Sequence, residues 1–239
     1  MMNHKIQCSI TSVDEFKDPK LFQKGLALLP DFGSWKERKE SISRLRRQES
    51  RLESLVAGLM LRTLLLENSL PLEALSVSEK GKPFLKNHDF HFNLSHSNGY
   101  VVCAFGSVPC GIDIQKEKED RSNIARIFFT ESEYALVQKY GVSMFTRIWA
   151  LKESYVKYKG EGLSLPLKSF QVYPGSYDIL SDASEWGRLS TCISTIYSTD
   201  RTCQAREFAF NDYRIAVCSA LATEPNICRL STESLLCII

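Results

Sequence analysis

Two side chains that could bind a metal ion lie in the segment Gly111-Ile112-Asp113-Ile114-Gln115. On a β-strand, residues two apart point to the same face, so Asp113 and Gln115 would project together while the isoleucines enter the core. A carboxylate and an amide oxygen are ligands that a hard cation prefers. The segment equally fits an ordinary strand with one polar face, so it indicates a metal site only weakly by itself.

A second candidate set lies in the segment 149–157, where Trp149, Glu153 and Lys157 are four residues apart. On a helix this spacing places the three side chains on one face. An aromatic ring, a carboxylate and an ammonium group on one stripe could form a site. They could also form an exposed Glu–Lys pair beside a core-facing indole, which is the commoner arrangement on an isolated helix.

A phosphate-binding turn could follow the segment Phe92-Asn93-Leu94-Ser95-His96-Ser97. An imidazole and two hydroxyls at the end of a strand suit phosphate oxygens. The neighbouring Ser95 and His96 also suggest a serine hydrolase. Against that, adjacent residues on a strand point to opposite faces, which separates a nucleophile from its base. The sequence also contains no Gly-x-Ser-x-Gly elbow.

Basic residues are concentrated between positions 36 and 51, where three glutamates interrupt them. The basic residues are Lys36, Arg38, Lys39, Arg44, Arg46, Arg47 and Arg51. Such a run is typical of a solvated, salt-bridged helix face, although it could also hold a polyanionic ligand. Gly81-Lys82-Pro83 adds a lysine in a turn, and alone it indicates only the turn.

The elements that must position these residues follow from periodicity. Apolar residues at helical spacing predict one helix over residues 36–67, ended by Asn68 and Pro71. The Thr-x-x-Glu pattern at Thr130 predicts a capping box and a helix that ends at Gly141. We expect Ser143 to cap a further helix that runs to about Tyr158.

Strand patterns fill the remaining regions. They cover residues 91–94, 100–105, 110–115, 170–173, 192–197, 205–210 and 213–220. Turns are predicted at 97–99 and at Asn211-Asp212, and a charged loop at 116–122. Each half therefore shows a helix followed by antiparallel strands, which predicts an α+β fold with two similar lobes.

Composition narrows the class of protein. The chain has 239 residues, 44% of them hydrophobic and 24% charged, which are ordinary globular values. A net charge of only +2 argues against a nucleic-acid binder, although such binding through the 36–51 helix would show steep salt dependence. We recognise no signal peptide and no membrane-spanning run. The eight cysteines lack zinc-finger spacing, which predicts free thiols in a reducing cytoplasm.

Taken together and in order, five motifs resemble those of the surfactin-type 4′-phosphopantetheinyl transferases. They are Gly81-Lys82-Pro83, Phe92-Asn93-Leu94-Ser95-His96-Ser97, Gly111-Ile112-Asp113-Ile114, Arg126-x-Phe128-Phe129-Thr130-x-x-Glu133-Tyr134 and Trp149-x-x-Lys152-Glu153-Ser154-x-x-Lys157. The stretch 160–167 also looks like the family's. The resemblance is strong over residues 81–170, looser in the basic helix and faint beyond Phe170.

The resemblance implies an α+β pseudo-dimer of two similar α/β lobes, with the active site in the cleft between them. It implies an N-terminal lobe at 1–108 on the nucleotide and 3′-phosphate side, a C-terminal lobe at 109–225 with the metal and catalytic residues, and a tail at 226–239. A pseudo-dimer needs no partner subunit, so a monomer is expected.

The implied activity is magnesium-dependent transfer of 4′-phosphopantetheine from coenzyme A to a serine of an acyl or peptidyl carrier protein. The other product is adenosine 3′,5′-bisphosphate. The alternative is a non-catalytic module that binds coenzyme A or a carrier protein.

Roles are carried over residue by residue. Asp113 and Glu153 resemble the magnesium ligands, with Gln115 in the third ligand position. Glu153 is also the candidate general base, and Lys157 resembles the lysine that contacts the phosphate nearest the pantetheine. The residues expected to bind coenzyme A are Lys36, Lys39, Arg51, Lys82, Ser95 and His96, with His96 and the three residues of the basic run at the 3′-phosphate.

Gln115 departs from the family, in which this position is often glutamate. A neutral amide can bind the metal through its oxygen or hold a metal-bound water, but it cannot act as a base. The site would then have two formal negative charges, from Asp113 and Glu153, and the role of Glu153 as base gains importance.

Overall fold

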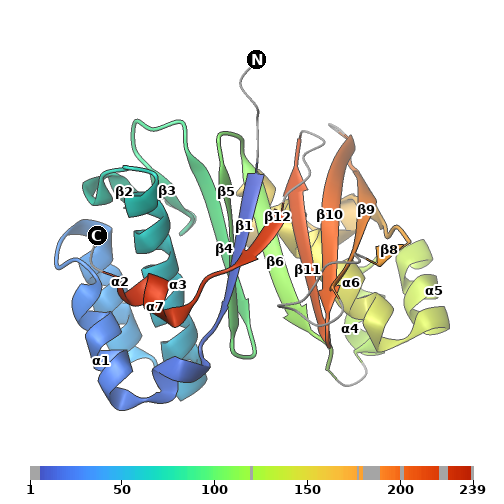
Figure 1. Cartoon of the computed structure of the whole chain (residues 1–239). Helices are drawn as coiled ribbons and strands as arrows, with labels where there is room; N and C mark the ends of the chain where they lie inside the picture. The colour runs from blue at the N-terminus through green and yellow to red at the C-terminus, as the bar shows by residue number, and fades with distance from the viewer. Residues whose placement is uncertain are drawn as a thin grey trace.

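The computed structural model describes residues 6–118, 121–176, 178–179, 189–199, 202–220 and 226–237. Two sheets lie side by side, and each has helices packed on its outer side (Figure 1). The first sheet has the strand order β12-β1-β5-β4 and the second has the order β6-β11-β10-β9-β7, with β8 also paired to β9. This arrangement confirms the predicted α+β fold with two lobes.

The strands have the following bounds. The first sheet contains β1 (Ile6–Ser12), β4 (His91–Ser97), β5 (Tyr100–Gly106) and β12 (Asn226–Arg229). The second contains β6 (Cys110–Lys116), β7 (Gln171–Tyr173), β8 (Asp178–Ile179), β9 (Leu189–Tyr197), β10 (Thr202–Phe210) and β11 (Tyr213–Ser219). A small separate pair is formed by β2 (Leu75–Val77) and β3 (Pro83–Leu85).

The α-helices are α1 (Pro19–Leu28), α2 (Gly33–Arg44), α3 (Gln48–Glu67), α4 (Ser122–Phe128), α5 (Glu131–Tyr140), α6 (Val142–Lys159) and α7 (Thr232–Leu236). Short 3₁₀ turns occur at Asp14–Lys17, Leu72–Ala74, Gly162–Ser164 and Leu167–Ser169. The strand and helix positions agree with most of the sequence patterns, with two exceptions at helix boundaries.

The first exception is the predicted single helix over 36–67, which is wrong. The chain leaves the helix at Leu45, whose backbone is extended, and starts α3 at Gln48. In one continuous helix, Trp35 would lie roughly 30 Å from Leu55. With the break, α2 folds back and both residues are buried in the same core. The turn between α2 and α3 contains no proline or glycine that would mark it in the sequence. It therefore depends on the burial of apolar side chains.

The second exception is the start of α6. Ser143 does not cap this helix, because Gly141 holds the N-cap position and the helix begins at Val142. Gly141 has a φ of 74°, a backbone conformation that favours glycine. The other local signals are confirmed: Thr130 forms a capping box with Glu133, and α5 ends at Tyr140.

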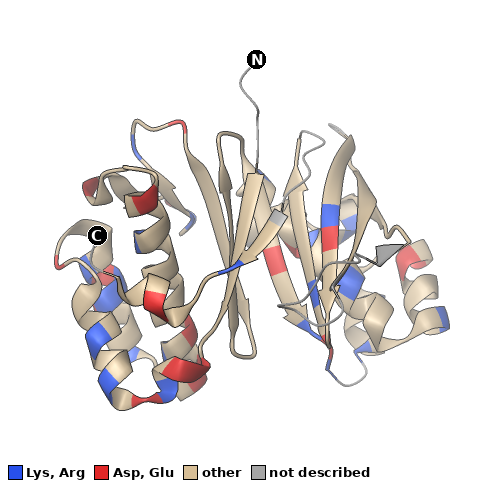
Figure 2. Cartoon of the chain, viewed as in Figure 1, with Lys and Arg blue, Asp and Glu red and all other residues tan. Residues whose placement is uncertain are grey.

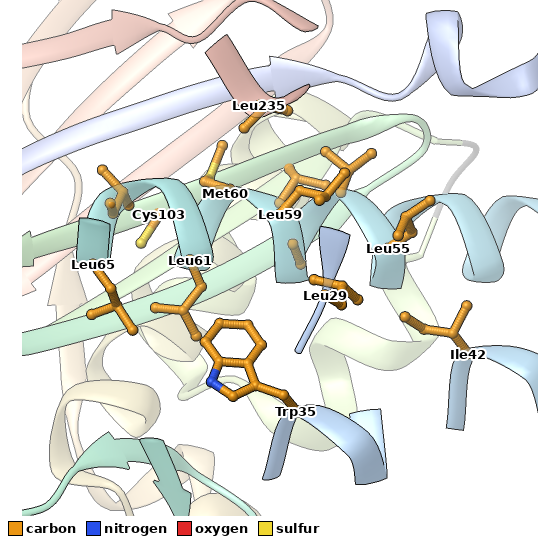
Figure 3. Packing of buried hydrophobic residues seen from close by; sticks show 14 of the residues in the cluster. Leu29, Trp35, Ile42, Leu55, Leu59, Met60, Leu61, Leu65, Cys103 and Leu235 are labelled. Carbon is orange, nitrogen blue, oxygen red and sulfur yellow. The ribbon is translucent and has the colours of Figure 1, made fainter. Parts of the chain in front are cut away.

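The core of the first lobe forms between the sheet and helices α1, α2, α3 and α7. Figure 3 shows side chains from α3, including Leu55, Leu59 and Leu61, packed against Trp35 and Leu29. Because neighbours cover α3 on several sides, its residues from 52 to 65 are all buried except Ser54. A helix that is buried on most sides has apolar residues around most of its circumference.

A second core joins the two lobes. Apolar residues of β1 and β5, such as Ile10 and Val102, pack with residues of β6 and β11, such as Ile112 and Val217. The lobes therefore share buried apolar surface. A third core, which contains Ile148, Leu151 and Tyr155 of α6, forms between that helix and its neighbours in the second lobe.

Side chains also join the two sheets where β4 runs beside β6. The side-chain oxygens of Asn93, Ser95 and Ser97 accept hydrogen bonds from the main-chain N–H groups of residues 112, 114 and 116, at 2.9, 3.5 and 3.2 Å. Each pair is separated by 19 residues, so the two strands run parallel at this junction. The polar face of β4 thus satisfies the edge of β6 and fixes the register of one lobe on the other.

The end of the described chain adds to the first lobe. Strand β12 pairs in parallel with β1, and α7 packs on α3. Arg62 Nη1 donates a hydrogen bond to the carbonyl oxygen of Cys237 at 3.3 Å. The predicted division of the chain at residue 108 stays a prediction. The segment expected to be a tail contributes a strand and a helix to the first lobe.

Two compositional expectations can be compared with the structure. All eight cysteines have free thiols, as predicted. Over the described residues, no helix combines the length and apolar character needed to cross a bilayer.

Candidate active site

Asp113 lies in the middle of β6 at the junction of the lobes, and only 2% of its surface is exposed. Its Oδ1 accepts a hydrogen bond from Ser95 Oγ at 2.7 Å, and its Oδ2 accepts one from Gln115 Nε2 at 2.9 Å. Lys157 Nζ lies 2.6 Å from the same Oδ1. Asp113 and Gln115 therefore share a face, as the strand pattern predicts. The carboxylate is held by donors from both lobes.

Helix α6 lies so close to β6 at Gly111 that a side chain there would collide with it. A Cβ on Gly111 would lie 2.1 Å from the carbonyl oxygen of Ser154 and 2.4 Å from the amide nitrogen of Tyr158. Both positions are far inside van der Waals contact. The missing side chain lets α6 bring Glu153 and Lys157 to the level of Asp113.

Glu153 and Lys157 both project from α6 toward this carboxylate. Lys157 Nζ donates hydrogen bonds to Asp113 and, at 2.8 Å, to Ser95 Oγ. Burial raises the pKa of Glu153, and the nearby charge of Asp113 raises it further, while Lys157 lowers it in part. The charges of Asp113 and Lys157 thus both act on the Glu153 carboxylate. This is a site in which ionisation of Glu153 costs free energy, and a cation would relieve that cost.

Lys82 reaches the same place from the first lobe. Its Nζ donates a hydrogen bond to the carbonyl oxygen of Lys157 at 2.6 Å, near the end of α6. Burial lowers the pKa of Lys82. The turn before β3 therefore brings a partly desolvated amine to the site, which suits contact with an anion.

A cavity of about 630 Å³ opens beside these residues. Its lining includes the charged residues Lys82, Glu153 and Lys157 and the apolar residues Phe128, Trp149 and 165–167. Trp149 also stacks on Phe145, with ring centroids 5.7 Å apart. The stripe predicted on α6 is therefore real, and its indole forms part of an apolar wall. The size and mixed lining suit a ligand with a charged end and an apolar arm.

Ser95 and His96 point to opposite sides of β4. Ser95 Oγ bonds to Asp113 and Lys157, whereas His96 Nδ1 lies 2.9 Å from Glu53 Oε2 on α3. This geometry separates the hydroxyl from the imidazole, as the alternation of side chains on a strand predicts, and argues against a serine hydrolase.

The basic residues between positions 36 and 51 lie in different surroundings. Lys39 Nζ bonds to Asp31 at 2.6 Å and to the carbonyl oxygen of Leu29 at 3.2 Å. The Arg51 guanidinium lies 5.2 Å from the centre of the Phe22 ring, and Lys36 is exposed. Figure 2 shows basic and acidic residues interspersed along the helices of this lobe. The structure shows no contact between these residues and His96, so their joint role at one phosphate stays a prediction.

Sequence reasoning missed two residues that shape the site. Asn93 bonds to the amide of Ile112, and polar residues at 93, 95 and 97 were a readable signal for one polar face of β4. Glu53 carries no such signal, because its neighbours in the sequence indicate an apolar core helix. Its contact with His96 depends on how α3 crosses the sheet.

The donor set is compatible with a magnesium ion. Asp113 and Glu153 supply two close carboxylates, and the amide of Gln115 keeps its oxygen as a further acceptor. The described residues contain no group of three or more His, Cys, Asp or Glu that could hold a metal. Magnesium usually keeps several waters and needs only one or two carboxylates, so a two-carboxylate site fits it.

Comparison with known proteins identifies the family. Residues 109–218 match the model of the 4′-phosphopantetheinyl transferase superfamily, and residues 32–107 match the model of the 4′-phosphopantetheinyl transferase N-terminal region. A 4′-phosphopantetheinyl transferase of Bacillus subtilis is 34% identical over 205 residues, which cover 80% of this chain and 83% of the relative.

Two further relatives agree. The transferase Sfp of Bacillus subtilis (strain 168) is 39% identical over 170 residues, covering 67% of this chain and 70% of Sfp. The transferase gsp of Aneurinibacillus migulanus is 38% identical over 144 residues, covering 57% of this chain and 60% of the relative. Together with the ordered motifs and the site between the lobes, these matches show that the chain belongs to the 4′-phosphopantetheinyl transferase family.

Proposed function

We propose that this chain transfers 4′-phosphopantetheine from coenzyme A to a serine of an acyl or peptidyl carrier protein, with Asp113, Glu153 and Lys157 at the reacting phosphates. One observation carries the proposal most directly. Glu153, whose pKa is raised, lies with Asp113 and Lys157 beside a cavity of about 630 Å³ between the lobes. Family membership supplies the reaction class.

The carrier serine hydroxyl attacks the phosphorus next to the pantetheine. A new P–O bond forms, the bond to the bridging pyrophosphate oxygen breaks, and adenosine 3′,5′-bisphosphate leaves. Glu153 accepts the serine proton, directly or through a water molecule. Its raised pKa supports this role, because a base whose pKa lies closer to neutral accepts a proton more readily.

Lys157 and Lys82 would hold and orient the phosphates. Phosphoryl transfer depends mainly on positioning and on stabilising negative charge, so two ammonium groups beside the carboxylates suit it. Lys157 Nζ donates hydrogen bonds to Ser95 and Asp113, which fixes its position in the cavity lining. The apolar wall would face the pantetheine arm.

Magnesium would be held by Asp113 and Glu153, with Gln115 as ligand or as holder of a metal-bound water. When bound, the ion would supply positive charge to the phosphate oxygens as negative charge develops on them. The repulsion between the Asp113 and Glu153 carboxylates supports this assignment, because a bound cation would offset it.

We expect a cytoplasmic monomer whose partners are coenzyme A and the carrier protein, with neither nucleic acid nor membrane as a partner. The net charge of +2 argues against a nucleic-acid partner, and the buried core that the two lobes share supports a monomer.

The deciding experiment incubates the chain with coenzyme A, magnesium and a panel of apo-carrier proteins, and measures the intact mass of each carrier. We expect one or more carriers to gain the phosphopantetheine mass, and the gain to disappear with a chelator. Binding of coenzyme A without any mass gain would instead support the non-catalytic module.

A further inference from the structure

Glu53 is a buried carboxylate on α3 that contacts the hairpin between β4 and β5. Its side chain is only 7% exposed. Oε1 accepts a hydrogen bond from the amide of Gly99 at 3.1 Å, and Oε2 lies 2.9 Å from His96 Nδ1. One carboxylate therefore holds both the imidazole and the turn that follows it.

The contact favours an ionised Glu53. Burial alone would raise the pKa of Glu53, but the hydrogen bonds from His96 and Gly99, with the charges of His96 and Lys118, outweigh burial and leave the pKa lowered. An ionised carboxylate can only accept hydrogen bonds. The proton between the two side chains must therefore reside on His96 Nδ1.

The hairpin tip is fixed from three directions. Glu53 holds the amide of Gly99, Val13 donates its amide to the Gly99 carbonyl at 2.9 Å, and Tyr213 Oη donates to the carbonyl oxygen of Asn98 at 2.7 Å. Asn98 and Gly99 have φ values of 45° and 89°, as a tight two-residue turn requires. The backbone that carries His96 is thus anchored to both lobes.

The other ring nitrogen of His96 is available. Half of the His96 side chain is exposed, and within the described residues Nε2 has no hydrogen-bond partner. A histidine whose Nδ1–H is bound to a carboxylate has its orientation and tautomer set by that carboxylate. His96 Nε2 is therefore presented to solvent in one defined direction.

We propose that Glu53 is a positioning residue that orients His96 Nε2 toward a phosphate of the substrate and stabilises the doubly protonated ring when that phosphate binds. The inference rests on the proposed function and on the role that the family resemblance implies for His96, at the 3′-phosphate of coenzyme A. Glu53 itself touches no substrate in this arrangement. Its effect passes entirely through His96.

The test compares affinities for coenzyme A and 3′-dephospho-coenzyme A by calorimetry. Glu53→Gln keeps the size of the side chain and removes its charge. We expect it to weaken coenzyme A binding about 5- to 10-fold, in the range for a typical intramolecular hydrogen bond, and to leave 3′-dephospho-coenzyme A binding unchanged. Glu49→Gln, an exposed acid on the same helix, is the matched control and should change neither affinity.

A double-mutant cycle separates positioning from general stability. In a His96→Ala background, Glu53→Gln should change coenzyme A affinity less than about 2-fold. An undiminished effect in that background, or equal weakening for both ligands, would overturn the proposal. Either result would leave the transferase function intact, because carrier mass gain by the unmutated chain tests that function separately.

A measurement on the unmutated chain covers the case in which Glu53→Gln does not fold. The chain has four histidines, so the ring nitrogens can be followed by proton–nitrogen NMR and His96 assigned with His96→Ala. We expect Nδ1 to be protonated in the free protein, and Nε2 to shift with coenzyme A but not with 3′-dephospho-coenzyme A. A His96 ring protonated only on Nε2 in the free protein would contradict the inference.

Discussion

Two lysines of helix α6 each pair with a carboxylate from another element, and the two pairs lie in different environments. Lys152 Nζ lies 2.9 Å from Glu133, and Lys157 Nζ lies 2.6 Å from Asp113. The first pair is fully enclosed, with both side chains 0% exposed. In the second, Lys157 is 27% exposed and faces the cavity. The chemical groups are the same, and the surroundings differ.

Both side chains of the enclosed pair form hydrogen bonds with main-chain groups. Lys152 donates to the carbonyl oxygens of Leu167 and Phe170 at 2.7 and 2.8 Å. Glu133 accepts from the amides of Thr130 and Val172, both at 2.8 Å. Burial lowers the pKa of Lys152 even though Glu133 opposes this. These bonds connect α5, α6 and β7 and hold the segment that forms the cavity wall.

Next to the open pair, one carboxylate has unused capacity to accept hydrogen bonds. Within the described part of the chain, the Glu153 carboxylate beside Lys157 has no hydrogen-bond partner, and its pKa is raised. An ion pair whose bonds are complete stabilises structure, whereas one beside an unsatisfied carboxylate and a cavity can exchange partners with a ligand. Completeness of hydrogen bonding, more than residue type, distinguishes the two roles.

The largest effect is expected from Glu153→Gln, next to the open pair. Loss of a general base lowers rates by about 100- to 10,000-fold, so transfer should fall below detection, while coenzyme A binding is only weakened. Initial rates of carrier mass gain measure this. Glu161→Gln, a nearby acid outside the pair, serves as control. Near-normal transfer by Glu153→Gln would remove Glu153 from the chemistry.

The next effect contrasts Lys152→Met with Lys157→Met. Lys152→Met leaves Glu133 buried without its cation and should lower the free energy of unfolding by about 3–5 kcal/mol. Lys157→Met should cost less, about 1–2 kcal/mol, because Asp113 keeps bonds from Ser95 and Gln115. Urea unfolding measures both. Equal losses of stability in the two variants would contradict the assigned difference between the pairs.

Gly111→Ala tests the spacing that brings α6 to the open pair. The added Cβ would meet the backbone of Ser154 and Tyr158, so α6 must move away from β6. We expect a loss of about 1–3 kcal/mol in stability, and a decrease in transfer rate that persists at temperatures where the variant is fully folded. Transfer at the original rate by a folded variant would show that this close approach is dispensable.

The smallest effect is expected from Gln115→Glu, which adds a third carboxylate to the open site. It should be tolerated or tighten magnesium binding, and its charge should raise the pKa of Glu153 further. Since Glu153 accepts a proton only when ionised, transfer falls as pH decreases through its pKa, and this fall should move to higher pH in the variant. Profiles of kcat/KM against pH and magnesium titration measure both effects. Complete inactivity would show that the assigned metal geometry is wrong.

Local signals in the sequence were sufficient for most strands and for the helix that starts after Thr130. They failed at Leu45, where the reversal into α3 depends on burying Trp35 in the same core as Leu55 and Leu59. They also missed β1 and β12, whose pairing links the two ends of the described chain. Long-range burial and pairing leave little trace in a window of neighbouring residues.

Ordered motifs and periodic spacing are local properties, so the amino-acid sequence was sufficient to predict the family, the two-lobed fold class and Asp113, Glu153 and Lys157 as candidate site residues. Which lysine is anchored and which is open depends on the tertiary structure. It also revealed the contact of Glu53 with His96 and the close approach at Gly111. These features depend on how elements distant in sequence pack together, and burial and hydrogen-bond completion exist only after that packing.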